Sequence, residues 1–109
     1  MNQPSGAIVE LEPAEVQARL VRGEVVLVDV RETNEIAAER IPGALAFPLS
    51  RFDPATLPGG DPSRVVFSCA GGKRSAIAVA QCRAAGIPAD THMRGGIAAW
   101  KAAGLPTER

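Results

Sequence analysis

Two apolar runs constrain the fold of this chain more than any other feature. Val25–Val30 and Val65–Ser68 consist mostly of valine, leucine and phenylalanine, without the polar alternation of a half-exposed strand. Continuous apolar strands are typical of parallel sheets, because helices cover both faces of such sheets. We therefore predict that both runs are buried strands of one parallel sheet, with Val25–Val30 as a central strand.

Helical patterns alternate with strands along the rest of the chain. The other expected elements, in order, are a strand at 7–9, a helix from residue 12 that Gly23 ends, a short helix at 33–40 with Thr33 or Asn34 near its N-cap, a strand at 44–47, a loop with one helical turn at 48–62, a helix at 76–85, a strand at 89–93 and a helix at 97–103. This alternation predicts an α/β fold of three layers, with a central, mostly parallel sheet and helices on both faces.

Length and charge narrow the classes of protein to which the chain can belong. For 109 residues we expect one domain over residues 1–109, with its core at about 9–107 and a flexible terminus at 1–6. The 12 basic and 12 acidic residues cancel without a single-sign run, which argues against binding to nucleic acid or anionic lipid. No segment approaches the roughly 20 apolar residues that span a bilayer, and no signal peptide is recognisable. We expect a cytoplasmic monomer.

The chain has few residues that bind metal ions well. Its two cysteines, Cys69 and Cys82, stand thirteen positions apart, and His92 is the single histidine. This set fits neither a disulfide framework nor a zinc site, so we expect free thiols, no metal and no cofactor. Cys82 lies within an expected helix, where packing is favoured over a resolving-thiol role. We expect His92 at the surface or at a cap, and Trp100 in the core.

Cys69 directly follows the second apolar strand, at the place where open α/β sheets bind ligands. Small residues follow it, so backbone N–H groups can turn toward the sulfur, and the helix expected from near Ser75 directs its positive end there. Nearby cations also lower the pKa of a cysteine. The candidate site is Cys69 as nucleophile, with an anion-binding loop of Ala70, Gly71, Gly72, Lys73, Arg74 and Ser75.

A nucleophilic thiolate at this position predicts sulfur transfer. The thiolate can attack the outer sulfur of thiosulfate or of a similar sulfane donor, release sulfite and keep the sulfur as a persulfide on Cys69. A thiol, cyanide or a partner protein would then accept that sulfur. Asp29 and Arg31, at the end of the first apolar run, are expected to support the neighbouring loops by bonding to backbone and by pairing with Glu32 or Glu35.

Four motifs in register resemble the rhodanese family. They are Asp29-Val30-Arg31, Ile41-Pro42-Gly43-Ala44, Cys69-x-x-Gly72-x-Arg74-Ser75 and Gly95-Gly96-Ile97-x-x-Trp100, and the resemblance covers residues 10–108. It implies a rhodanese-like fold, a catalytic Cys69 and a loop to Arg74 or Ser75 that binds the donor anion and the transferred sulfur. Two positions depart from the family pattern: Glu39-Arg40 stands where Gly-His is common, and Ser68 where an aromatic residue is common.

Three other functions remain open. Related dual-specificity phosphatases and arsenate reductases have Cys-x5-Arg, whereas four residues separate Cys69 from Arg74 here. The smaller ring suits one sulfur atom better than a tetrahedral phosphate, which favours sulfur transfer. A carrier that passes persulfide sulfur from one protein to another would use the same chemistry on Cys69. Non-catalytic rhodanese-like interaction modules have lost the cysteine, so the intact Cys69 argues against that function.

Overall fold

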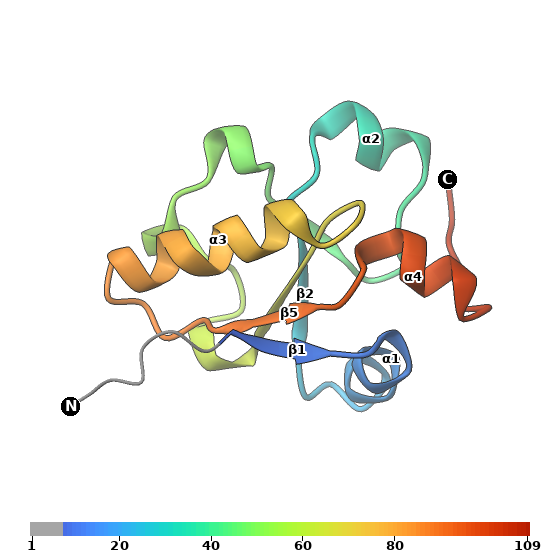
Figure 1. Cartoon of the computed structure of the whole chain (residues 1–109), viewed down its shortest axis with the longest axis horizontal. Helices are drawn as coiled ribbons and strands as arrows, with labels where there is room; N and C mark the ends of the chain where they lie inside the picture. The colour runs from blue at the N-terminus through green and yellow to red at the C-terminus, as the bar shows by residue number, and fades with distance from the viewer. Residues whose placement is uncertain (1–7) are drawn as a thin grey trace.

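The computed structural model describes residues 8–109, and a sheet of five parallel strands runs through the middle of this range (Figure 1). The strands are β1 (Val9–Leu11), β2 (Val26–Asp29), β3 (Leu45–Ala46), β4 (Val65–Ser68) and β5 (Thr91–Met93), in the spatial order β1-β5-β4-β2-β3. Every neighbouring pair is parallel, as predicted. Both apolar runs are interior strands, although β4 rather than β2 is the middle one.

Helices cover both faces of the sheet (Figure 1). They are α1 (Pro13–Val21), α2 (Thr33–Ala38), α3 (Lys73–Ala84) and α4 (Gly96–Ala102), with 3₁₀ turns at Leu49–Arg51, Pro54–Thr56 and Pro62–Arg64. α3 packs against β4 and β5 on one face, whereas α1 and α4 contact each other at the opposite face. The predicted three-layer α/β arrangement is thus confirmed. Among residues 8–109, each helix is too short or too polar to cross a lipid bilayer.

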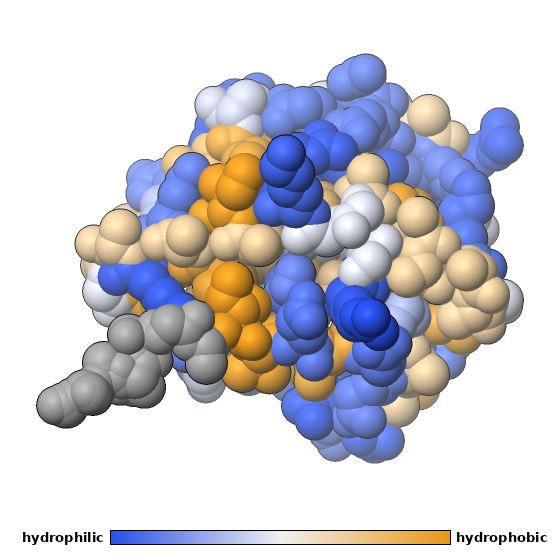
Figure 2. Space-filling view, in the orientation of Figure 1, coloured by the Kyte–Doolittle hydropathy of each residue, from blue (hydrophilic) through white to orange (hydrophobic). Residues whose placement is uncertain are grey.

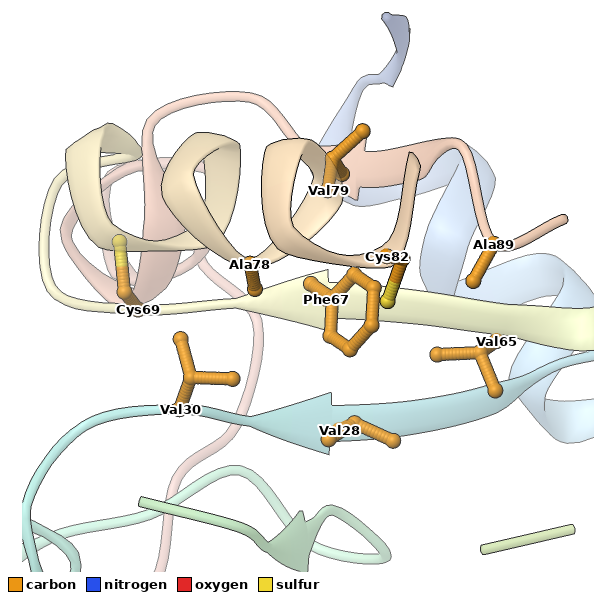
Figure 3. Packing of buried hydrophobic residues seen from close by; sticks show 9 residues of the cluster. All are labelled: Val28, Val30, Val65, Phe67, Cys69, Ala78, Val79, Cys82 and Ala89. Carbon is orange, nitrogen blue, oxygen red and sulfur yellow. The ribbon is translucent and has the colours of Figure 1, made fainter. Parts of the chain in front are cut away.

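The two faces of the sheet build two separate hydrophobic clusters. Val28 and Phe67 pack with Cys82 of α3 in one cluster (Figure 3). Leu27 belongs to the other cluster, together with Trp100 of α4. Successive residues of a strand point to opposite faces, so burial of both faces explains why the apolar runs lack polar alternation. Trp100 is 2% exposed, which confirms its predicted core position.

Several strand boundaries shift by one or two residues from the predictions, and the loop at 48–62 also differs. The first strand lies at Val9–Leu11 instead of 7–9, because its register is set by pairing with Thr91–Met93 of β5. The loop at 48–62 contains more than one helical turn, since 3₁₀ turns begin within it at three points. Residue 7 and the terminus expected to be flexible, residues 1–6, lie outside the described residues.

The start of α2 agrees with the prediction, whereas the start of α3 differs. α2 begins at Thr33, next to the N-cap residue, which is Glu32. The Glu32 carboxylate accepts the N–H of Glu35, and the Glu35 carboxylate accepts the N–H of Glu32 at 2.9 Å, which is a reciprocal capping box. α3 begins at Lys73, earlier than expected, so the end of the predicted anion-binding loop forms the first helical turn.

Glu39 and Arg40, which depart from the family pattern, form hydrogen bonds with the C-terminal segment. The Arg40 N–H donates to the Glu108 carbonyl at 2.9 Å, and the Glu108 N–H donates to the Arg40 carbonyl at 2.8 Å. The Glu39 carboxylate accepts hydrogen bonds from Lys101 at 2.8 Å and from Thr107 at 2.6 Å. A glycine at position 39 has no side chain for these bonds, so the departure has a structural consequence.

The surface mixes polar and apolar residues. On the face shown in Figure 2, hydrophobic patches alternate with hydrophilic ones. The exposed large apolar side chains among the described residues are Val9, Val21, Leu45 and Ile77, and each belongs to a different helix or strand. The monomeric state stays a prediction.

The first turn of α4 lies against the backbone of Cys69. The Ile97 N–H donates to the Cys69 carbonyl at 2.8 Å, and the Ala98 N–H donates to the Ala70 carbonyl at 3.1 Å. Gly96 has a φ of +61°, and a Cβ there would collide with the Cys69 carbonyl oxygen and lie 2.7 Å from the Ala70 oxygen. Glycine therefore permits the close approach that fixes the end of β4.

We predict that Gly96→Ala lowers the free energy of unfolding by about 2–5 kcal/mol, through left-handed backbone strain and overlap with the Cys69 carbonyl. Gly104→Ala is the matched control, because Gly104 has a φ of +79° and no atom within 4 Å of an added Cβ. The control should lose about 1–2 kcal/mol from strain alone. Urea unfolding of both variants measures the difference, and equal losses would contradict a tight contact at Gly96.

Candidate active site

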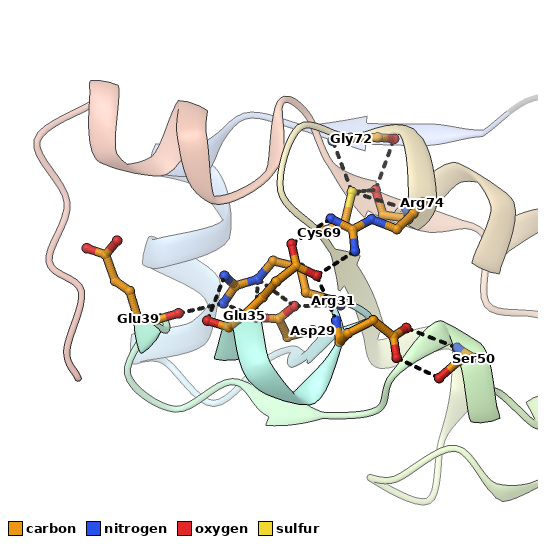
Figure 4. Close-up of polar contacts among 10 residues, drawn as sticks. Asp29, Arg31, Glu35, Glu39, Ser50, Cys69, Gly72 and Arg74 are labelled. Atoms are coloured by element: carbon orange, nitrogen blue, oxygen red, sulfur yellow. Dashed lines mark hydrogen bonds and ion pairs between the residues drawn. The ribbon is translucent and has the colours of Figure 1, made fainter. Parts of the chain in front are cut away.

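Cys69 lies at the end of β4, with its sulfur enclosed by the loop that follows (Figures 3 and 4). The residue is only 1% exposed. The Gly72 N–H donates to Sγ at 3.0 Å, and the Ser75 N–H donates to Sγ at 3.3 Å. The thiol in turn donates to the Ser75 hydroxyl oxygen, which lies 3.5 Å from Sγ. The sulfur is thus held by backbone and side-chain groups of its own loop.

Gly72 allows the loop to close on the sulfur. It is the N-cap of α3 and has a left-handed φ of 104°, a conformation that glycine adopts without strain. Lys73, Arg74 and Ser75 follow as the first helical turn, where N–H groups have no partner within the helix. The Ser75 N–H is directed at Sγ instead, so the positive end of α3 faces the sulfur.

Two opposing effects set the pKa of Cys69. Burial raises it, whereas the hydrogen bond with the Ser75 side chain and those from the N–H groups of Ser75, Gly72 and Gly71 lower it. The net pKa lies below the ordinary thiol value, which favours the nucleophilic thiolate. Burial instead raises the pKa of Cys82 to about 11, and that thiol packs in the cluster under α3. This position agrees with the packing role predicted for Cys82.

The two cations of the loop do not supply these hydrogen bonds. Lys73 is exposed to solvent. The Arg74 guanidinium donates to both carboxylate oxygens of Glu35, at 2.7 and 3.0 Å (Figure 4). This bond raises the pKa of Arg74, and the negative charge of Cys69 adds to the effect. Binding of a donor anion by Lys73 and Arg74 therefore stays a prediction, while Ser75 and the loop amides hold the resting sulfur.

Asp29 and Arg31 form a buried ion pair beside the loop. Nε and Nη2 of Arg31 donate to the Asp29 carboxylate at 2.8 to 3.1 Å. The same guanidinium donates to the carbonyls of Glu35, at 3.4 Å, and Glu39, at 2.8 Å. The predicted pairing with the carboxylate of Glu32 or Glu35 is wrong, because residues two apart in an extended segment point the same way and meet each other first. Through these carbonyls, the Asp29–Arg31 pair fixes the position of α2. This helix carries Glu35, the partner of Arg74.

His92 is a residue of the site that the sequence analysis missed. It is 3% exposed, so the predicted surface or capping position is wrong. Its Nδ1 lies 2.7 Å from Ser75 Oγ, and its Nε2 lies 3.0 Å from a carboxylate oxygen of Glu10. The sequence did carry a signal, because a residue inside the predicted strand 89–93 of a doubly covered sheet is expected to be buried. Within residues 8–109, no group of three or more His, Cys, Asp and Glu side chains could hold a metal ion.

Comparison with known proteins places these residues in context. The family model for the Rhodanese-like domain matches residues 12–103. The chain is 41% identical to an uncharacterized protein of Synechocystis sp. over 91% of this chain and 55% of that protein, so it spans about half the length of that relative. It is 36% identical to a sulfurtransferase of Allochromatium vinosum, over 89% of this chain and 92% of the relative. The structure of thiosulfate sulfurtransferase from Pseudomonas aeruginosa superposes with a TM-score of 0.82 at 33% identity, over 94% of this chain and 20% of that one.

We predict that the Glu35–Arg74 pair stabilises the fold in a pH-dependent manner. Hydrogen bonds from Arg74 and from the Glu32 N–H lower the pKa of Glu35 from 4.5 to about 2. A folded-state pKa below the unfolded value means that the stabilisation is complete above pH 4.5 and is lost as the pH falls toward 2. Glu35→Gln should therefore cost about 1–2 kcal/mol at neutral pH, after allowance for solvent screening, and little in acid.

Urea unfolding across this pH range checks the prediction. Glu24→Gln is the matched control, since Glu24 also accepts two bonds from an arginine, Arg22, but at the exposed surface. The control should change stability little at any pH. A Glu35→Gln deficit that persists unchanged in acid would contradict the assigned ion pair.

Proposed function

The chain belongs to the rhodanese-like domain family, and from this premise we propose that it is a sulfurtransferase in which Cys69 carries the transferred sulfur as a persulfide. The observation that carries the proposal is the convergence of the Gly72 and Ser75 N–H groups on a buried thiol whose pKa is lowered. The name of the Allochromatium vinosum relative, a sulfurtransferase, supports transfer of sulfur in general.

In the first half of the proposed reaction, the Cys69 thiolate attacks the outer sulfur of thiosulfate or of a similar sulfane donor. A bond forms between Sγ and that sulfur, the bond to the leaving group breaks, and sulfite departs with the electron pair. The donor is a dianion, and the exposed Lys73 at the start of α3 is suited to attract it. The name of the Pseudomonas aeruginosa structure supports thiosulfate as the first donor to test.

In the second half, a thiophilic acceptor attacks the outer sulfur of the persulfide. With cyanide, a carbon–sulfur bond forms, the sulfur–sulfur bond breaks and the Cys69 thiolate is restored as thiocyanate leaves. The second half restores the Cys69 thiolate, whose sulfur is the atom at which the loop N–H groups point. A thiol or the cysteine of a partner protein would accept the sulfur by the same displacement.

The closed loop favours this reaction over phosphate or arsenate chemistry. Gly72 and Ser75 bring their N–H groups to 3.0 and 3.3 Å from one sulfur atom, and that sulfur is buried. A tetrahedral oxyanion needs donors spread around several oxygens, as a longer loop provides.

We predict that wild-type protein incubated with thiosulfate gains one sulfur atom, which cyanide removes as thiocyanate. Cys69→Ser should lose both the adduct and the thiocyanate, because the nucleophile is gone. Cys82→Ala is the control and should keep both, since burial raises the pKa of that thiol to about 11 and leaves it unreactive. Intact-protein mass spectrometry and a thiocyanate assay provide the measurement.

Other results would redirect the assignment. Slow loading from thiosulfate with rapid loading from a persulfidated protein would identify a protein-to-protein carrier. Failure to load from any sulfane donor would sink the catalytic role and favour an interaction module. Arsenate reduction or phosphate ester hydrolysis that depends on Cys69 would overturn the preference for sulfur transfer.

A further inference from the structure

A continuous line of hydrogen bonds runs from the sulfur of Cys69 across the α3 face of the sheet to the β1 edge. Sγ lies 3.5 Å from Ser75 Oγ, which lies 2.7 Å from Nδ1 of His92. On the other side of the ring, Nε2 lies 3.0 Å from Oε2 of Glu10. The four residues come from the end of β4, α3, β5 and β1, and Glu10 pairs directly with His92 in the β1–β5 register.

The two neighbours of the imidazole define its tautomer. Nε2 faces a carboxylate, which only accepts hydrogen bonds, so Nε2 carries the hydrogen of a neutral ring. Nδ1 is then the acceptor, and the Ser75 hydroxyl donates to it at 2.7 Å, a shorter contact than the 3.2 Å to the Gly72 carbonyl. With its hydrogen committed to His92, the Ser75 oxygen is free to accept the thiol hydrogen of Cys69.

We propose that His92, paired with the Glu10 carboxylate, takes the thiol proton of Cys69 through the Ser75 hydroxyl. The S–H bond breaks and the proton passes to the Ser75 oxygen, while the original hydroxyl proton of Ser75 passes to Nδ1 of His92. The products are a Cys69 thiolate and a His92 imidazolium, joined by an intact serine. The negative Glu10 carboxylate stabilises the imidazolium at Nε2, so charge and protons balance without another reactant.

Two arginines near this line pair with other carboxylates. Arg94, which follows β5, pairs with Glu12 at 3.2 Å, and the loop arginine Arg74 pairs with Glu35. We call the line Cys69–Ser75–His92–Glu10 the relay. The titratable groups at its two ends are Glu10 from β1 and Cys69 from the end of β4. His92 does not contact the sulfur and acts on it only through Ser75, so we class it as a positioning residue and not as a catalytic one. The inference deepens the proposed function, because it supplies the thiolate on which sulfur transfer depends.

The composition of the chain makes the relay directly measurable. It contains no tyrosine, so ultraviolet absorbance of the thiolate is free of tyrosinate, and Cys69→Ser provides the blank for Cys82. His92 is the only histidine, so its imidazole nitrogen signals in an NMR spectrum need no assignment among several rings. Neither measurement uses a sulfur donor, so failure of the relay and failure of sulfur transfer are distinguishable.

Thiolate titration of wild type and variants is the first arm of the test. Glu10→Gln should lower the thiolate fraction at neutral pH about threefold, and His92→Asn about tenfold, since a pKa rise of one unit is a tenfold change. Asn keeps an acceptor for the Ser75 hydroxyl but cannot hold a proton. Glu12→Gln is the matched control, because it removes an exposed carboxylate close to Glu10 along the chain that pairs with Arg94 instead of His92. The control should match the wild type.

The pH dependence of the His92 signals is the second arm. In wild type the imidazolium should persist to higher pH than in Cys69→Ser, because the thiolate stabilises it. Ser75→Ala should abolish this difference by breaking the line between the two groups. The proposal is overturned if the Cys69 thiol of Glu10→Gln and His92→Asn titrates as in the wild type. It is also overturned if the pH dependence of the His92 signals is the same in Cys69→Ser as in the wild type. Because Glu10 is half exposed at the sheet edge, Glu10→Gln keeps the test valid even if the buried His92 variant fails to fold.

Discussion

The position at which β4 ends governs the rest of the site. β4 is the middle strand, and its last carbonyls are held from both sides: the Val30 N–H donates to Ser68 at 2.8 Å, and the Ile97 N–H donates to Cys69 at 2.8 Å. With its backbone fixed by two neighbouring connections, Cys69 cannot move away from the loop that follows. A short loop and a glycine at 72 then suffice to bring amide groups to the sulfur, because the loop and its target are joined covalently.

The two cysteines show that hydrogen-bond donors, rather than burial, decide which thiol ionises. Cys69 and Cys82 are both buried in the same cluster, yet the pKa of Cys69 is lowered while that of Cys82 is raised to about 11. An unpaired charge in a protein interior costs several kcal/mol, whereas a hydrogen bond to a charged group contributes about 1.5–3 kcal/mol. Donors from Ser75 and the loop amides therefore offset the desolvation of Cys69.

The sequence pattern predicted the layers of the fold well, because burial of a strand on both faces leaves a local trace such as Val25–Val30. It located the chemistry for a similar reason, since Cys69 and its loop follow a strand directly. The pattern failed where partners come from distant segments. The pairing of Arg74 with Glu35 and of His92 with Glu10 depends on sheet order and register, which residue preferences do not encode.

The distribution of charge has a consequence for turnover in the proposed reaction. If the Arg74 cation were bound to the sulfur, it would stabilise the persulfide anion as a ground state and raise the barrier to the second transfer. Glu35 binds that guanidinium instead. The exposed Lys73 leaves a positive charge at the surface next to the loop, where a donor anion would arrive. The sulfur itself is held by amides and a hydroxyl, whose attraction is weaker than that of a guanidinium and stabilises the thiolate that the second transfer restores. In the proposed reaction, this arrangement favours release of the sulfur to an acceptor over its retention as a stable persulfide on Cys69.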